Sequence, residues 1–236
     1  KAGVEILAKE YPVDSKQKLT PEELIAVIPE YDALVVRSET KVTKDVIAAA
    51  KNLKVIGRAG VGVDNIDVEA ATQRGIIDLN APEGNTVAAT EHTIAMMMAL
   101  ARNVPQAYCS LQNGLWERSK FVGVEVRGKT LGILGMGRIG AGVAKRALAM
   151  EMNVLAYDPF IRAERAEALG VELAELDDIF ARADFITLHL PLTAETKKLI
   201  NKAAFAKMKK GVRILNVARG GVIDEADLMA AIDEGI

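Results

Sequence analysis

The fold of this chain is decided by the stretch Thr130-Leu-Gly-Ile-Leu-Gly-Met-Gly-Arg-Ile-Gly140. The apolar run before the glycines is typical of a buried parallel strand, and the Ala-rich segment from Arg138 to Met150 is typical of the helix that follows. The glycine motif therefore lies between a strand and a helix, as a phosphate-binding turn requires. The stretch predicts the beginning of a nucleotide-binding βαβ unit.

Each glycine of the motif has a separate physical role in such a turn. Gly135 permits the tight turn, Gly137 lets the backbone approach a pyrophosphate, and Gly140 lets the helix pack closely on the strand. Asp158 ends the next predicted strand, about 20 residues past the turn, where a carboxylate accepts hydrogen bonds from ribose hydroxyls. An ordinary glycine-rich connection is the alternative, but the strand, the helix and the acidic partner together favour a dinucleotide site. A carboxylate there repels a 2′-phosphate, which favours NAD as the cofactor.

Composition limits the classes of protein to consider. With 236 residues, half of them hydrophobic, the chain is long enough for one large or two modest domains. A formal net charge of -2 carries no general basic footprint, so nucleic acid is not an expected partner. The single Cys109 excludes an internal disulfide framework and fits a reducing cytoplasm, and no residue spacing supports a metal site. The longest apolar stretch, Ile94 to Ala101, is too short to span a bilayer, so no membrane partner is expected.

The first third of the sequence alternates short helical and strand patterns. Thr20 begins a capping box with proline at the first helical position, and Thr43 and Asp67 cap two further helices. Strands are predicted at 33–36, 53–56 and 76–79. A long helical pattern then runs from Thr86 to about Asn103, a length that suits an element connecting two lobes. We place the domain boundary near Asn80, which gives domains of residues 1–80 and 81–236.

The remainder of the chain has the rhythm of a doubly wound parallel sheet with right-handed crossovers. Strands are predicted at 130–135, 153–158, 185–189 and 212–217, and helices at 141–150, 163–169 and 203–208. Asp224 caps a last helix from Glu225 to Glu234. The chain is therefore predicted to be an α/β protein.

Three further segments follow predicted strands, where open parallel sheets bind ligands. Gly57 to Asp67 is dense in glycine and contains one cation, a plausible nest for a carboxylate. His189-Leu-Pro-Leu192 ends a strand, so its backbone is placed to line the cofactor groove. Asn216 to Gly221 carries a guanidinium at a strand end, and arginine suits a bidentate grip on a carboxylate.

Together these segments resemble the D-2-hydroxyacid dehydrogenase family, and most closely its D-3-phosphoglycerate dehydrogenase branch. The resemblance covers essentially the whole chain, and its motifs occur in the same order as in the family. They are Leu34-Val-Val-Arg-Ser38, Thr40-Lys-Val42, Gly57 to Asp67, Asn80-Ala-Pro82, Gly84-Asn-Thr86, Glu91-His-Thr93, Gly128-Lys-Thr-Leu-Gly-Ile-Leu-Gly135, Tyr157-Asp-Pro159 and Asn216-Val-Ala-Arg-Gly-Gly221. The resemblance implies a Rossmann-type NAD domain and a smaller, flavodoxin-like α/β substrate domain, both truncated.

The family's functional residues then fall on particular positions of this sequence. The resemblance implies that Arg219 is the catalytic arginine, binding the substrate carboxylate and polarising its C2 oxygen. It implies cofactor contacts from Gly135, Gly137, Arg138, Ile139, Gly140, Asp158, Leu190, Pro191, Val217, Ala218 and Arg219. It implies substrate contacts from Arg37, Ser38, Gly60, Val61 and Gly62, with Val61 acting through its backbone. On charge arguments alone, Arg37 is equally well explained as a solvated cation at a strand end.

The resemblance also implies groups that this sequence does not show. The family's catalytic glutamate and acid–base histidine are expected beyond Ile236, and a strand is expected before the first helical pattern. The chain is thus expected to be an internal portion of a longer enzyme, and to be inactive by itself. Of its two histidines, His92 is expected to have a packing or interlobe role, and His189 to line the cofactor groove without carrying protons.

The implied function is NAD-dependent oxidation of D-3-phosphoglycerate to 3-phosphohydroxypyruvate, the first step of serine biosynthesis. The implied assembly is a homodimer or homotetramer in the cytoplasm. Two alternatives stay open. Within enzymes, a glyoxylate or hydroxypyruvate reductase, or another D-2-hydroxyacid dehydrogenase, differs in whether a phosphate-binding cation faces the substrate. In another class, an NAD-sensing corepressor of the same fold would use the dinucleotide to drive dimerisation.

Overall fold

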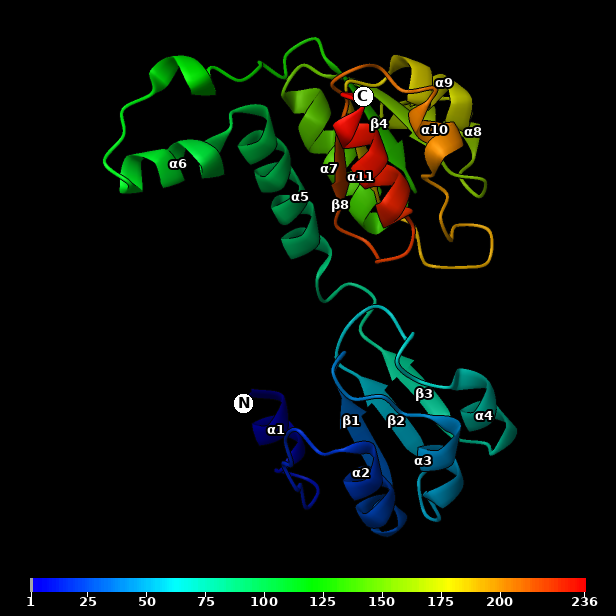
Figure 1. Ribbon diagram of the computed structural model, residues 1–236. Helices are drawn as coiled ribbons and strands as arrows, with labels where there is room; N and C mark the ends of the chain where they lie inside the picture. Colours follow the sequence, from blue (N-terminus) through cyan, green and yellow to red (C-terminus); the bar gives the residue numbers. More distant parts are fainter. Residues whose placement is uncertain (1) are drawn as a thin grey trace. The chain divides into compact units, whose positions relative to one another are not determined.

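The computed structural model describes residues 2–236 and divides into two compact units (Figure 1). The first unit extends to Asn85, and the second runs from Thr86 to Ile236. The boundary expected near Asn80 is a few residues earlier, at the end of strand β3 (Ile77–Asn80). Each unit is described separately below.

The first unit is built on a parallel sheet with the strand order β1-β2-β3. Its elements are α1 (Ala2–Leu7), α2 (Pro21–Val27), the 3₁₀ helix η1 (Ile28–Glu30), β1 (Ala33–Val36), α3 (Lys44–Ala49), β2 (Val55–Arg58), α4 (Val68–Gln73) and β3. Ile56 of β2 is fully buried in a core that contains Ile28, Val46 and Ala71. The side chains of this core come from the helices and from strand residues such as Val36 and Ile56.

Local sequence signals begin the helices of this unit as predicted. The Thr20 side chain accepts from the backbone N–H of Glu23 at 3.2 Å, and the Glu23 carboxylate accepts from the N–H of Thr20 at 2.8 Å. This confirms the capping box, with Pro21 in the first turn. Thr43 and Asp67 likewise accept backbone hydrogen bonds at the starts of α3 and α4.

The second unit contains a five-stranded parallel sheet with the order β6-β5-β4-β7-β8. The strands are β4 (Thr130–Leu134), β5 (Asn153–Tyr157), β6 (Glu172–Leu173), β7 (Phe185–Leu188) and β8 (Arg213–Asn216). Chain order runs outward from β4 to β6, then returns to place β7 on the other side of β4. The predicted doubly wound sheet is confirmed, and its switch point lies between β4 and β7. The two-residue β6 was not predicted.

Helices cover both faces of this sheet. Leu131 and Ile133 of β4 belong to a core with α5 (Thr86–Ala101) and α7 (Arg138–Ala149). Leu134 of the same strand belongs to the opposite core, with α9 (Leu176–Arg182), α10 (Lys202–Phe205) and α11 (Glu225–Asp233). The helix α8 (Ala163–Ala168) follows β5. The strands β4, β5 and β7 are therefore buried on both sides, which explains their continuous apolar runs.

A small residue sets how closely α5 and α7 pack (Figure 1). A Cβ added at Gly142 of α7 would lie 2.7 Å from Oγ1 of Thr90, which is buried on α5. The Thr90 hydroxyl donates to the carbonyl of Thr86 one turn earlier at 2.7 Å, so it is satisfied within its own helix. This contact fixes α7, whose N-terminus carries the glycine motif.

Two α-helices of this unit were not predicted, α6 (Val104–Gln112) and the α9 described above. α6 follows a residue with positive φ, Asn103, and has no buried residue. Together with the 3₁₀ helix η2 (Arg118–Phe121), it forms a segment that extends away from the sheet in Figure 1. Among the residues described here, no helix combines the length and apolarity needed to cross a membrane.

Candidate functional site

The predicted site residues of the second unit all follow the carboxyl ends of strands. Gly135 follows β4, Asp158 follows β5, His189 follows β7, and Val217 follows β8. Parallel strands bring these positions to one edge of the sheet, and the switch point between β4 and β7 lies within that edge. The fold therefore collects residues that are far apart in sequence where ligands bind in open parallel sheets.

The three glycines of the motif differ in what surrounds them. Gly135 has φ of +98°, and a Cβ there would lie 2.6 Å from the carbonyl oxygen of His189. A Cβ at Gly140 would overlap the carbonyl oxygen of Gly135. At Gly137, by contrast, a Cβ would meet nothing within 4 Å. Two glycines are thus required by the protein itself, and the third keeps open a space outside the turn.

The helix after the turn offers donors to an anion. α7 begins at Arg138, and its N-cap, Gly137, makes no side-chain capping hydrogen bond. The first N–H groups of a helix have no intrahelical acceptor, and the helix dipole favours negative charge there. Open space at Gly137 beside such an N-terminus fits the pyrophosphate of a dinucleotide. Arg138 is exposed and Ile139 is half-buried at this end of the helix.

Asp158 contacts the glycine turn directly. Its Oδ2 accepts from the backbone N–H of Met136 at 2.7 Å, and its Oδ1 accepts from the N–H of Phe160 at 2.8 Å. The carboxylate is half-buried and held in one orientation at the end of β5. A carboxylate has about four acceptor sites, so these bonds leave capacity for ribose hydroxyls.

The segment after β7 contains a histidine unsuited to proton transfer at neutral pH. Burial lowers the pKa of His189 from 6.5 to about 4, and its Nε2 lies 3.1 Å from Oγ1 of Thr187. The next residue, Leu190, is buried, whereas Pro191 is exposed. His92, the other histidine, is exposed on α5, so it does not pack in the core of this unit, and the interlobe role stays a prediction.

Arg219 lies in a short loop after β8 and is half-buried. One of its guanidinium nitrogens, Nη1, donates to the carbonyl oxygen of Ala218 at 3.0 Å. The loop is also joined to the segment after β7, since the N–H of Lys198 donates to the carbonyl oxygen of Gly221 at 2.7 Å. The predicted cofactor and substrate residues of this unit therefore share a connected set of loops.

In the first unit, the predicted substrate residues follow β1 and β2. Arg37 and Ser38 are exposed in the turn after β1. Asn65 holds that turn, because its Nδ2 donates to the carbonyl oxygen of Arg37 at 2.9 Å and to that of Thr40 at 2.7 Å. The structure thus brings the Arg37 turn against the glycine-rich segment from Gly57 to Asp67.

The glycine-rich segment itself presents backbone donors. The Asn80 side chain donates to the carbonyl oxygen of Val61 at 2.7 Å, and the N–H of Ala81 donates to that of Gly60 at 2.9 Å. Within the part of the chain that the structure describes, no acceptor is found for the N–H groups of Val61 and Gly62. These two successive N–H groups are available to an anion, as the predicted nest requires.

Arg58 also lies at this site, although it is not among the expected substrate contacts. Its Nε lies 3.4 Å from Oδ1 of Asn65, and its guanidinium lies where a Cβ at Gly60 would overlap it. The cation therefore packs on the nest and not away from it. A cation within a glycine-rich segment, directly at the end of a strand, is the sequence signal that identifies it.

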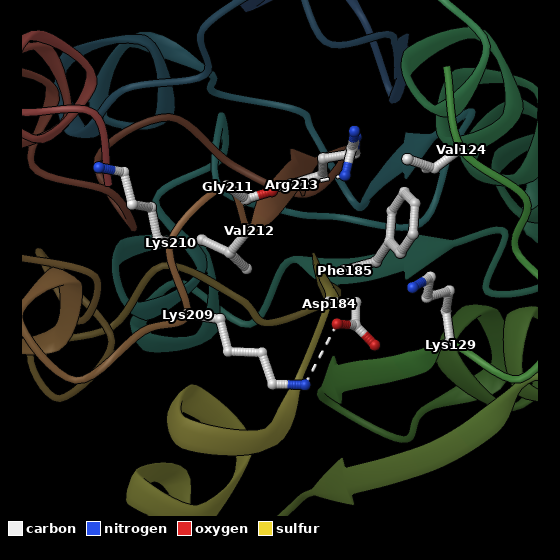
Figure 2. A pocket seen from close by; sticks show the side chains of 9 residues that line it. All are labelled: Val124, Lys129, Asp184, Phe185, Lys209, Lys210, Gly211, Val212 and Arg213. Atoms are coloured by element: carbon white, nitrogen blue, oxygen red, sulfur yellow. Dashed lines mark hydrogen bonds and ion pairs between the residues drawn. The ribbon is translucent and has the colours of Figure 1, made fainter. Parts of the chain in front are cut away.

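A small cavity lies elsewhere in the second unit (Figure 2). Its lining residues precede strands, with Lys129 before β4, Asp184 before β7 and Val212 before β8. Asp184 is paired with Lys209 at 3.1 Å, and Arg213 lies over the ring of Phe185. This cavity is at the amino edge of the sheet, opposite the carboxyl edge that carries Asp158 and Arg219.

Comparison with known proteins places this geometry in a family. The family model described as the D-isomer specific 2-hydroxyacid dehydrogenase NAD-binding domain matches residues 94–236. The chain belongs to this family. The predicted resemblance and the predicted NAD cofactor are thereby confirmed.

Individual relatives agree with the family match. D-3-phosphoglycerate dehydrogenase from Archaeoglobus fulgidus is 59% identical over 223 residues, which are 94% of this chain and 42% of that protein. The TT0316 protein from Thermus thermophilus has a TM-score of 0.90 at 34% identity, over 99% of this chain and 75% of that one. D-lactate dehydrogenase from Aquifex aeolicus, solved with NAD and lactic acid, has a TM-score of 0.82 at 31% identity, over 89% of this chain and 63% of that one. The chain spans about two fifths of the length of the curated relatives it matches.

Proposed function

We propose that the full-length protein oxidises D-3-phosphoglycerate to 3-phosphohydroxypyruvate with NAD, the first step of serine biosynthesis. The observation that carries the proposal is the presence of Arg219 on the same carboxyl edge as the glycine turn and Asp158. The name shared by the curated relatives at 52–59% identity supports this substrate.

The cofactor is held by backbone groups and one carboxylate. Gly135, Gly137 and Gly140, with the N–H groups of Arg138 and Ile139, receive the pyrophosphate at the start of α7. Asp158 accepts from the ribose hydroxyls, and the backbones of Leu190, Pro191 and Val217 to Arg219 line the rest of the groove. When bound, NAD supplies the acceptor for the hydride that leaves C2 of the substrate.

Arg219 binds the carboxylate of the substrate and polarises its C2 oxygen. A planar guanidinium presents two parallel N–H donors to a carboxylate, which fixes orientation as well as distance. Orientation matters because transfer between two bound molecules requires the reacting atoms to be held close and aligned. The hydrogen bond from Arg219 to the Ala218 carbonyl would be exchanged for this contact.

The first unit supplies cations and donors for the phosphate of the substrate. The exposed guanidinium of Arg37, the hydroxyl of Ser38 and the nest from Gly60 to Gly62 are the proposed contacts, and Arg58 strengthens the positive field of the nest. A reductase acting on glyoxylate or hydroxypyruvate has no phosphate to bind, so these cations favour the phosphorylated substrate.

We assign the proton-accepting role to neither histidine of this chain. His189 remains neutral at pH 7, and a base whose pKa is about 4 has little driving force to accept a hydroxyl proton. His92 is exposed on α5 and is not among the residues that follow the strand ends. The residues assigned to this chain bind and orient the reactants.

The protein acts as a homodimer in the cytoplasm, with α6 and the segment after it as the interface. Trp116 is 76% exposed, Tyr108 62% and Leu111 54%, an unusual concentration of large apolar side chains on one projecting segment. Trp116→Glu should shift the mass in analytical ultracentrifugation from dimer to monomer. A tetramer in the wild type would show that a second surface also takes part.

The activity is tested by following NADH formation with the full-length protein. The substrates compared are D-3-phosphoglycerate and D-glycerate, with glyoxylate and hydroxypyruvate assayed in the reducing direction. We expect D-3-phosphoglycerate to have the highest kcat/KM, and Arg37→Ala to lower that value while leaving D-glycerate unaffected. A preference for glyoxylate would assign the protein to the reductases, and NAD binding without turnover on any substrate would favour the corepressor class.

A further inference from the structure

We propose that Asn216 is a positioning residue whose side chain holds the loop that carries Arg219 in the orientation needed to bind the substrate carboxylate. This inference rests on the proposed function, since it concerns the same site. It assigns a role to a side chain that contacts neither cofactor nor substrate in that proposal.

The amide of Asn216 makes two hydrogen bonds to the loop that follows it. Its Oδ1 accepts from the backbone N–H of Ala218 at 3.1 Å, and its Nδ2 donates to the carbonyl oxygen of Arg219 at 2.9 Å. The first bond is an Asx turn, in which an Asn side chain bonds the backbone two residues on. The second bond connects the same side chain to the backbone of Arg219.

These two bonds enclose the part of the backbone that directs the arginine. The N–H of Ala218 and the carbonyl of Arg219 lie on either side of the peptide that joins the two residues. Fixing both ends restricts the dihedral angles at Ala218 and Arg219, and those angles set the direction in which the Arg219 side chain leaves the backbone. The guanidinium bonds the Ala218 carbonyl, which belongs to that enclosed peptide.

Few side chains can make this pair of contacts. The loop requires one acceptor and one donor on a short arm, and an asparagine amide carries both. An ionised aspartate only accepts, so the Arg219 carbonyl would lose its donor. A serine hydroxyl forms the first turn more weakly. The side chain of Ala makes neither bond.

The other end of the loop is held independently. Beyond Arg219, the carbonyl oxygens of Gly221 and Val222 accept from the N–H groups of Lys198 and Ile200 at 2.7 and 3.1 Å. The N–H of Asp224 then donates back to Ile200 at 2.8 Å. Arg219 therefore lies between a backbone ladder, which no side-chain substitution removes, and the contacts made by the Asn216 side chain.

Removal of the Asn216 amide should change function more than stability. The side chain is exposed, and exposed hydrogen bonds exchange readily with water, so the folded state loses little. A loop freed at one end allows the guanidinium to leave its bound direction, and a misplacement of about 1 Å can cost on the order of 10²-fold in rate.

Asn201 provides a matched control in the same unit. Its Oδ1 accepts from the N–H groups of Ala203 and Ala204 at 3.0 and 3.2 Å, and its Nδ2 donates to the Lys198 carbonyl at 3.1 Å. The Asn201→Ala variant thus loses the same kind of contacts at the start of α10, and none of these contacts is to residues 216–219. Both variants are made in the full-length protein, and each is checked by its unfolding midpoint.

We expect Asn216→Ala to lower kcat/KM for D-3-phosphoglycerate by roughly 10- to 100-fold, with a much smaller change in the Kd for NADH measured by fluorescence. Asn216→Ser should lie between Ala and wild type, because its hydroxyl forms the weaker turn. Asn201→Ala should keep the wild-type kcat/KM. Equal losses of NADH binding and of kcat/KM in Asn216→Ala would overturn the positioning role.

A double-mutant cycle separates positioning from a general structural effect. If Asn216 acts through Arg219, Asn216→Ala should cause little further loss when combined with Arg219→Lys. Additive losses would overturn the inference, as would wild-type kinetics for Asn216→Ala in a protein that oxidises D-3-phosphoglycerate. Absence of turnover in the wild-type protein would instead overturn the proposed function, and the positioning role with it.

Discussion

The backbone N–H of Met136 donates a hydrogen bond to Oδ2 of Asp158, with 2.7 Å between the two atoms. This bond joins the glycine turn after β4 to the end of β5, so the residue proposed to bind the ribose also supports the turn proposed to bind the pyrophosphate. The other carboxylate oxygen is held by the N–H of Phe160. Asp158 is thus oriented before any ligand arrives, which reduces the entropic cost of binding.

We predict that the full-length protein prefers NAD to NADP because the charge of Asp158 opposes a 2′-phosphate. Calorimetric titration should show the preference to be about 1–3 kcal/mol, or roughly 5- to 150-fold in Kd. Asp158→Asn should reduce the ratio of the Kd for NADP to the Kd for NAD. Asp177→Asn, which changes an exposed carboxylate on α9, should leave that ratio unchanged. Equal or tighter binding of NADP by the wild type would contradict the assignment.

Arg219→Lys should reduce turnover far more than cofactor affinity. Lysine keeps the positive charge but loses the planar pair of donors that grips a carboxylate. We expect kcat/KM for D-3-phosphoglycerate to fall by about 10²-fold or more, as for removal of one donor that stabilises developing charge. Steady-state kinetics with an unchanged kcat/KM would show that Arg219 does not contact the substrate.

Two alanine substitutions in the glycine motif should affect different properties, one mainly the stability of the protein and the other mainly its affinity for NAD. Gly140→Ala forces a Cβ into the Gly135 carbonyl, so we expect a loss of about 1–3 kcal/mol in the free energy of unfolding. Gly137→Ala meets no neighbouring atom and should cost less than about 1 kcal/mol, as for alanine at a helix N-cap. Its methyl group would occupy the space proposed for the pyrophosphate, so NAD affinity should fall by roughly tenfold, or about 1.4 kcal/mol.

Urea titrations and NAD calorimetry on both glycine variants check these outcomes. If Gly137→Ala binds NAD as the wild type does, the dinucleotide does not approach the turn at this position. If Gly140→Ala is as stable as the wild type, α7 does not need to pack closely on the turn.

The half-buried His189 should make the protein sensitive to mild acid. Its pKa is about 4 in the folded state and near 6.5 when unfolded, so the unfolded state binds more protons between these values. Stability is therefore complete above the unfolded pKa and is lost as the pH falls towards 4. Between pH 7 and pH 5 we expect a loss of about 2 kcal/mol from this residue. Urea titrations at pH 7 and pH 5 measure this loss, and His189→Asn should not show it. If the free energy of unfolding of the wild type and of His189→Asn depends on pH in the same way, the prediction is wrong.

Much of the candidate site could be predicted from sequence because its signals are local. Thr20, Thr43 and Asp67 begin helices through hydrogen bonds to residues only three positions away. The glycine turn and Asp158 belong to one βαβ unit, so their spacing along the chain already implies their proximity. The strands β4, β5 and β7 of the second unit were predicted for a similar reason, since burial on both faces requires unbroken apolar runs.

Other features depend on contacts between distant positions. The two hydrogen bonds from Asn65 to the carbonyl oxygens of Arg37 and Thr40 join segments that no periodic pattern relates. The helix α6 follows a break at Asn103, which has positive φ, and Pro105 lies in its first turn, so the helical pattern of α5 does not continue into it. His92 was expected to have a packing or interlobe role, and its exposure on α5 depends on which face of that helix α7 covers.

The sequence by itself determined the α/β class, the position of the dinucleotide turn and the acidic residue that favours NAD, because each depends on backbone preferences and spacing within one supersecondary unit. Only the tertiary structure decided that Met136 and Asp158 are bonded and that burial lowers the pKa of His189. It also decided which glycine faces open space. These properties depend on the distances and solvent exposure that packing creates, and those quantities are set by all the elements that meet at the carboxyl edge of the sheet.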